Sequence, residues 1–278
     1  MKTRDLTYET LADWASRLSS CAALAYDTIE ANNSKIPAPS QYFVGLFPRH
    51  KVLLNDIANK FRTPEQFELV TCKILFRCII DDFINLLYMM QEDFSSDILE
   101  RHCASAYKQR HDLLVKSVDV NTKFFNGTHP ALFKISDKVR EQKELETNEL
   151  YKRFYKDWKA KHWKSFPPTT TIVTEELSSK SMVSIANAPA LMRWKDFSTW
   201  VHYSIVTYEF DLEETDQNRE RHFYREALSY SLKTLLIAWD ALKKTADIGD
   251  FSDLTNVHKE ILADSETIDV SDQMNRKF

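Results

Sequence analysis

Glycine is scarce in this chain, and its scarcity limits the folds that the chain can adopt. The 278 residues contain three glycines, Gly45, Gly127 and Gly249, which lie far apart. Phosphate-binding loops need several glycines close together, so that backbone amides can approach the ligand. Strand-and-turn folds also need glycine, because it tolerates positive φ at tight turns. The sequence therefore argues against a Walker-type or dinucleotide-binding loop and predicts a helical fold.

Apolar residues recur at three- and four-residue spacing along most of the chain, which is the pattern of amphipathic helices. Helices are expected over residues 8–31, 50–60, 63–91, 96–118, 136–161, 174–178, 190–208, 216–246 and 254–263. Pro48 is expected to end an irregular connection, because proline disrupts a helix interior. Residues 121–130 are expected to form a turn.

No linker divides the chain cleanly, and the most plausible interruption is the pair Pro167 and Pro168. We therefore predict an all-α fold, a single-domain multi-helix bundle over residues 1–263. Residues 264–278 are rich in Asp, Ser and Lys and are predicted to be a disordered tail.

The composition is that of a globular protein: 43% of the residues are hydrophobic, the mean hydropathy is -0.43 and the net charge is -4. No apolar stretch is long enough to cross a bilayer, and the N-terminus lacks the apolar run of a secretory signal. We therefore expect a cytoplasmic protein without a membrane partner. The net charge provides no general attraction for nucleic acid.

Motifs of metal and hydrolase chemistry are missing. The four cysteines lie in apolar, helical stretches without a C-x-x-C pair, and are expected to be reduced core residues. The chain contains no Glu-x-x-His, His-Glu-x-x-His or Gly-x-Ser-x-Gly motif. We therefore expect no metal site and no cofactor, while enzymatic activity is left open.

The helix over residues 63–91 is predicted to form the centre of the bundle. Residues 63–66 (TPEQ) fit an N-cap, a first-turn proline and a capping-box glutamine. Apolar residues lie on nearly every side of its helical wheel, and large apolar residues share the arc that holds Arg77 and Asp81. The helix is therefore expected to be covered on all sides, with Arg77 and Asp81 at least partly buried.

Arg77 and Asp81 stand four residues apart, within reach of an ion pair on one helix face. Two interpretations remain open. The pair lines a pocket for an anionic or polar ligand, or it is a structural ion pair that ties the central helix to its neighbours.

The R-x-x-x-D motif of Arg77 and Asp81 is followed, much later, by residues 194–204 (WKDFSTWVHYS). The combination resembles a family of bacterial helical domains of unknown function, in which an R-x-x-x-E helix precedes a Y-x-x-x-S-x-x-x-H helix. The resemblance covers residues 51–242 and implies an all-helical fold without a settled activity.

Ser198 and His202 match the second motif, and their spacing places both on one face of a helix. The chain differs from that family in having Asp81 in place of glutamate, and Trp194 or Phe197 in place of tyrosine. A shorter carboxylate has a different reach.

A polar pocket formed by Arg77, Asp81, Ser198 and His202 is the sharper hypothesis for these residues. The alternative for His202 is a core histidine, hydrogen-bonded to a neighbouring hydroxyl or carbonyl group.

The segment over residues 151–164 (YKRFYKDWKAKHWK) interleaves basic and aromatic residues. In nucleic-acid-binding proteins this mixture neutralises phosphates while the rings stack on bases. The candidate contacts are Lys156, Trp158, Lys159 and Lys161. The alternative is an ordinary amphipathic helix end with a solvated basic face.

These observations favour a non-enzymatic binding or interaction module whose partner is an unknown protein or a small polar ligand. The resemblance implies a bacterial cell, and we expect a role in a stress or defence system. The alternative is a nucleic-acid-processing effector similar to ribonuclease toxins. Helical ribonucleases of that kind carry an Arg and a His four to six residues apart, and no such pair occurs in this chain.

Overall fold

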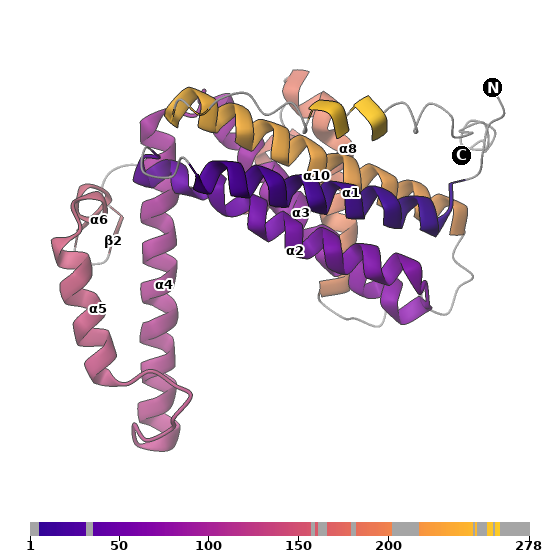
Figure 1. Ribbon diagram of the computed structural model, residues 1–278. Coiled ribbons are helices and arrows are strands. Elements are labelled where there is room, and N and C mark those ends of the chain that lie inside the picture. Colours follow the sequence, from indigo (N-terminus) through magenta and orange to yellow (C-terminus); the bar gives the residue numbers. More distant parts are fainter. Residues whose placement is uncertain are drawn as a thin grey trace. The chain divides into compact units, whose positions relative to one another are not determined.

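A computed structural model describes residues 6–31, 36–156, 159–160, 166–178, 182–201, 217–246, 248, 255–257 and 259–261. The all-α fold is confirmed (Figure 1). The elements are α1 (Tyr8–Glu30), η2 (Ala38–Ser40), α2 (Gln41–Arg62), α3 (Gln66–Gln91), α4 (Ser96–Phe125), α5 (Ile135–Thr147), α6 (Glu149–Phe154), β1 (Tyr155–Lys156), β2 (Lys159–Ala160), α7 (Thr169–Ser178), α8 (Met182–Val201) and α10 (Gln217–Ala246). The two short strands pair antiparallel, with Tyr155 opposite Ala160. Within the described ranges, no helix is both long and apolar enough to cross a membrane.

The chain forms two compact units. Unit 1 comprises Met1–Tyr88 and Thr169–Phe278, and unit 2 comprises Met89–Pro168, so that unit 2 is inserted in the sequence of unit 1. The second boundary falls directly after Pro168, where the sequence predicted an interruption. The single domain expected over residues 1–263 stays a prediction.

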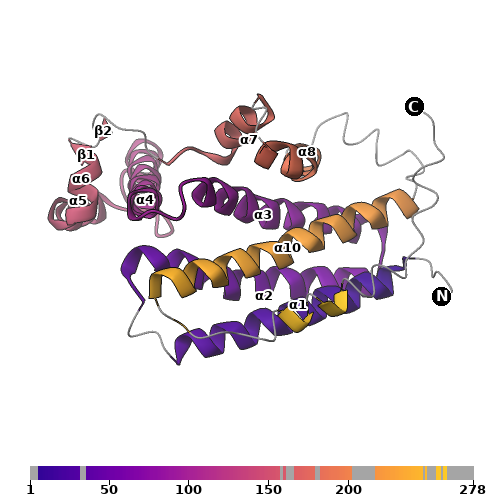
Figure 2. The ribbon, with the colours of Figure 1, turned by 90° about the horizontal axis from the view of Figure 1, so that it is seen from above.

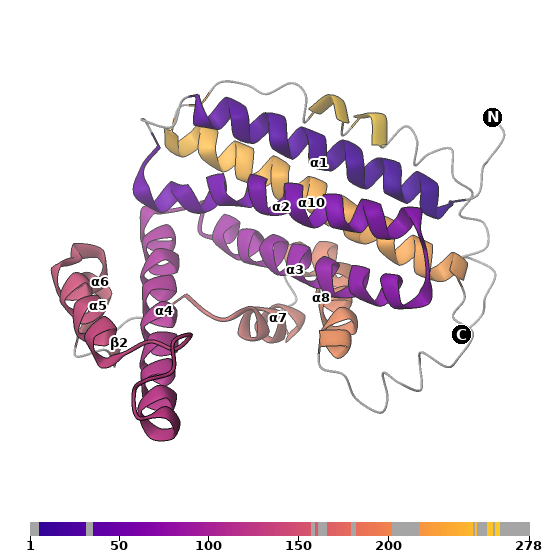
Figure 3. The ribbon, with the colours of Figure 1, turned by 60° about the horizontal axis from the view of Figure 1, so that its bottom comes forward.

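Unit 1 is built on α1, α2, α3 and α10, which run side by side (Figures 2 and 3). Aromatic rings join three of these helices in the core. The ring centroid of Tyr224 in α10 lies 5.1 Å from that of Phe61 in α2 and 5.5 Å from that of Phe76 in α3. These rings are at most 1% exposed. Burial of such large apolar surfaces is the main force that holds the four helices together.

The central helix α3 is confirmed, with a later start than expected. Its first residue is Gln66, and Thr63 instead ends α2, with its N–H donating to the carbonyl oxygen of Lys60. Apolar side chains of α3 are buried along its whole length, as Phe76, Phe83 and Met89 show. The prediction that α3 is covered on all sides was wrong, because Ile74 is 37% exposed.

The expected irregular connection up to Pro48 was wrong. Pro48 lies inside α2, which runs without interruption over 22 residues. Proline removes one helical hydrogen bond, but Phe43, Phe47 and Leu54 are buried on one face around it. Burial of this face outweighs the cost of the proline.

In unit 2, α4 extends past the expected end at residue 118 to Phe125, where Asn126 terminates it in the left-handed conformation. The helix expected over residues 136–161 is wrong in its second half. It breaks at Asn148, whose side-chain oxygen accepts the backbone N–H of Tyr151 and so starts α6.

Candidate functional site

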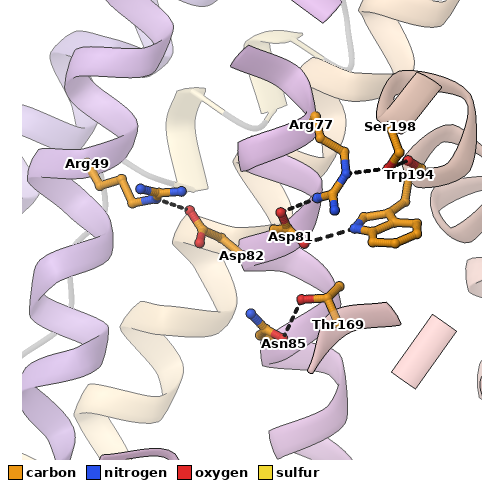
Figure 4. Close-up of polar contacts among 8 residues, drawn as sticks. All are labelled: Arg49, Arg77, Asp81, Asp82, Asn85, Thr169, Trp194 and Ser198. Atoms are coloured by element: carbon orange, nitrogen blue, oxygen red, sulfur yellow. Dashed lines mark hydrogen bonds and ion pairs between the residues drawn. The ribbon is translucent and has the colours of Figure 1, made fainter. Parts of the chain in front are cut away.

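Arg77 and Asp81 form an ion pair on α3, and α8 closes over it (Figure 4). The Nε of Arg77 donates to Ser198 Oγ at 2.6 Å, and the guanidinium carbon lies 3.9 Å from the ring centroid of Trp194. The indole N–H of Trp194 donates to Asp81 Oδ1 at 2.8 Å. Ser198 in turn donates to the carbonyl oxygen of Trp194 at 2.5 Å. The four side chains therefore form one closed network between two helices.

Both charged groups of this network are partly buried, with 15% of the Arg77 side chain and 29% of the Asp81 side chain exposed. Burial lowers the pKa of Arg77 from its ordinary value, and the negative charge of Asp81 opposes that shift. The guanidinium already has an anion on one edge, a hydroxyl group at Nε and an indole against its face. This arrangement favours the structural interpretation of the pair.

The structure brings three of the four predicted pocket residues, Arg77, Asp81 and Ser198, into contact. His202 lies outside the described residues, so its part in the pocket stays a prediction. Trp194 was missed as a partner of Asp81, although its position one helical turn before Ser198 was a usable signal.

A second polar network is buried between α2, α3 and α10. Arg49 Nε donates to Asp82 Oδ2 at 2.7 Å (Figure 4). The ring of His50 lies between Asp82 and Ser231: Nε2 is 3.3 Å from Asp82 Oδ2 and Nδ1 is 2.8 Å from Ser231 Oγ.

Asp, His and Ser also form the catalytic triads of hydrolases, but access of a substrate decides the role of Asp82, His50 and Ser231. A nucleophile must meet its substrate, and both His50 and Ser231 are 0% exposed. The network therefore joins three helices in the core instead of forming a reaction site.

A cleft of about 580 Å³ opens between α1, α8 and α10 in unit 1. Its apolar lining comes from all three helices and from the C-terminal segment. Representative side chains are Trp14, Leu18, Pro189, Leu232 and Ile261. This volume suits a small organic ligand.

Arg193 forms one wall of the cleft and has two carboxylate partners. Its Nε donates to Glu226 Oε2 at 2.8 Å, and its guanidinium carbon lies 3.5 Å from the ring centroid of Phe223. Asp196 accepts a further hydrogen bond from Nη1. Tyr230 donates to the other oxygen of Glu226 at 2.9 Å. Hydrogen bonds within the protein therefore hold this wall in place.

Arg225 and Lys233 also line the cleft, but they differ from Arg193 in their charged neighbours. Arg225 is partly buried, and no carboxylate of the described residues lies within 4.0 Å of its guanidinium nitrogens. Burial lowers the pKa of Arg225, against the opposing charge of Glu226. Lys233 is exposed and likewise has no carboxylate partner among these residues. The cleft therefore combines apolar walls with two cations that have no close carboxylate among the described residues.

This cleft was not expected from the sequence. One signal was present: His222, Arg225, Ser229 and Lys233 recur at three- and four-residue spacing, on one face of α10. Such a face resembles any solvated helix surface until its neighbours are known.

The nucleic-acid-binding candidates are only partly described. Lys156 and Lys159 belong to β1 and β2, while Trp158 and Lys161 lie outside the described residues. Tyr151, Phe154 and Tyr155, from the same segment, pack in the core of unit 2. Nucleic-acid binding stays a prediction. In the described part of the chain, no three His, Cys, Asp or Glu side chains converge as a metal site would require.

No family model, no curated protein and no solved structure matches this chain. The resemblance to the bacterial helical domains stays a prediction as well.

Proposed function

We propose that the chain is a helical binding module that holds a small organic anion in the cleft between α1, α8 and α10. Arg225 carries the proposal. Partial burial of a guanidinium group has a free-energy cost that a nearby anion offsets. Among the described residues no carboxylate lies within 4.0 Å of Arg225, and the charge of Glu226, which opposes the cost in part, is already bound by Arg193 and Tyr230. A carboxylate or phosphate group of a ligand supplies the missing charge, and arginine binds both in bidentate geometry.

The rest of the cleft defines the body of this ligand. Leu18, Leu232 and Ile261 offer apolar contact. Arg193 and Glu226 neutralise each other, so this wall orients the ligand but does not require its charge. Lys233 lies eight residues after Arg225, which corresponds to about 12 Å along a helix. The ligand that fits best carries its anionic group at Arg225 and an apolar body along α10 towards Lys233.

Calorimetric titration with paired ligands tests the proposal. One member of each pair is an organic carboxylate or phosphate, and the other is the neutral alcohol of the same carbon skeleton. We expect the anions to bind, and Arg225→Gln to weaken that binding by about 10- to 100-fold, the range of a lost charged hydrogen bond. Arg140→Gln, at an exposed arginine of unit 2, is the control and leaves binding unchanged. Equal binding of anions and alcohols, or no binding of either, contradicts the proposal.

A further inference from the structure

Large apolar side chains are exposed together at the end of the α4–α5 hairpin in unit 2. Phe124 is 66% exposed, Phe125 42%, Phe133 47% and Ile135 61%. All four lie at the end of α4, in the following loop or at the start of α5, and we call residues 123–135 the hairpin tip. Clustering of this kind marks an interaction surface, whereas single exposed apolar residues need no explanation.

The hairpin tip has a defined structure that holds these side chains outward. Asn121 is 0% exposed, and its amide nitrogen donates to the carbonyl oxygen of Phe133 at 3.1 Å and approaches those of His129 and Leu132. Its oxygen accepts the backbone N–H of His129 at 3.0 Å. Exposure of the aromatic rings is therefore built into the fold of the loop.

Positive charge flanks the apolar side chains. Lys123 and Lys134 are exposed at the hairpin tip. Asp137 accepts the N–H of Lys134 and pairs with Arg140, while Asp119 is exposed on α4, one turn before the tip. Residues 123–135 themselves contain two lysines and no acidic residue. The tip thus presents an apolar surface with a net positive rim.

The directions of the rings distinguish the possible partners. Consecutive residues of an α-helix point about 100° apart, so Phe124 and Phe125 project in different directions. A folded protein covers one face of a projecting tip and tends to exclude lysine from its interface. A bilayer surrounds an inserted tip on all sides, and lysine beside aromatic rings suits its anionic headgroups.

We propose that the hairpin tip docks on the surface of an anionic lipid bilayer. Phe124, Phe133 and Ile135 enter the interfacial region, while Lys123 and Lys134 contact phospholipid headgroups. Peripheral contact of this kind needs no membrane-spanning helix, and it is independent of the cleft in unit 1.

Co-sedimentation of the full chain with vesicles tests the proposal. We expect binding to vesicles of phosphatidylcholine mixed with phosphatidylserine, and little binding to phosphatidylcholine alone. Phe124→Ser with Phe133→Ser is expected to weaken binding about tenfold or more, because apolar burial drives insertion. Each single substitution, Lys123→Gln or Lys134→Gln, is expected to weaken vesicle binding about fivefold. This effect is expected to shrink at high salt, because salt screens the attraction.

The control pair Leu24→Ser and Val52→Ser removes apolar residues of similar exposure from unit 1. It leaves vesicle binding unchanged, while circular dichroism confirms that every variant keeps its helices. Equal binding to both kinds of vesicle, binding that survives the phenylalanine substitutions, or no binding overturns the proposal. Light scattering that shows a dimer dissociated by Phe124→Ser also overturns it, because the tip then serves a second copy of the chain.

Discussion

The indole N–H of Trp194 donates to Asp81 across 2.8 Å, and this bond links α8 to the central helix α3. The same indole ring covers the guanidinium group of Arg77. Asp81 thus holds a cation with one oxygen and an indole N–H with the other. The ion pair therefore belongs to the packing of α8 on α3.

A double-mutant cycle with Arg77→Met and Asp81→Asn measures the strength of this link. Each single substitution leaves a partly buried partner without its counter-charge, so we expect each to lower the free energy of unfolding by about 2–3 kcal/mol. The double variant is expected to lose less than the sum, with a coupling energy of about 1–2 kcal/mol in urea denaturation. Additive losses would show that the pair contributes nothing of its own.

Measuring anion binding in the cleft shows whether Arg77 and Asp81 have a structural role or bind the ligand. Folded Arg77→Met protein is expected to bind the organic anions as the unmodified chain does. A specific loss of anion affinity in this variant would instead assign the ligand to Arg77.

Ser231→Ala tests the buried network around His50. The substitution removes the hydroxyl group 2.8 Å from His50 Nδ1, in surroundings without solvent access. An unsatisfied buried polar group costs about 1–3 kcal/mol, and thermal and urea unfolding are expected to show this loss. Ser229→Ala is the matched control on α10, since among the described residues that hydroxyl group donates to the carbonyl oxygen of Glu226 alone. Similar losses of stability in the two variants would show that the hydrogen bond between His50 and Ser231 makes no specific contribution.

Alkaline pH is expected to destabilise the chain. Burial raises the pKa of Tyr151 to about 12 and also raises the pKa of Tyr42, Tyr224 and Tyr230. An unfolded tyrosine ionises near pH 10, so above that pH the unfolded chain has lost protons that the folded chain retains. Stability is therefore fully present below about pH 10 and falls as the pH rises towards the folded pKa values. Urea denaturation across this range measures the fall, and Tyr151→Phe should make it less steep; an unchanged slope would contradict the shift at Tyr151.

The sequence revealed those features that depend on local periodicity. The apolar wheel of α3 predicted a long, largely buried helix and the partial burial of Arg77 and Asp81, because side chains on every face of a helix need neighbours on every side. The predictions at Pro48 and at Asn121, where a turn was expected to begin, followed local preference: proline disrupts a helix interior, and asparagine is a weak helix former. Tertiary burial overrides that preference in α2, and hydrogen bonds to the following loop do so in α4.

The cleft could not be predicted from periodicity. Arg225 occupies an ordinary position on an amphipathic helix, and nothing in its own segment shows whether a carboxylate reaches it. Its surroundings come partly from α1, which is far from α10 in the sequence, and from the preceding described helix α8. The packing of these helices shows that Glu226 binds Arg193, and that no carboxylate of the described residues lies within 4.0 Å of Arg225.

Arg225→Met gives the sharpest test of whether this arginine serves the fold or a ligand. Methionine keeps the apolar length of the side chain and removes the charge. If a ligand is the partner of Arg225, the charge is a cost to the free protein, and the variant should be more stable by about 1 kcal/mol without ligand. The same variant should lose anion binding. A structural arginine predicts the reverse, a less stable variant whose anion binding is intact, so thermal unfolding and calorimetry on one protein decide between the two roles.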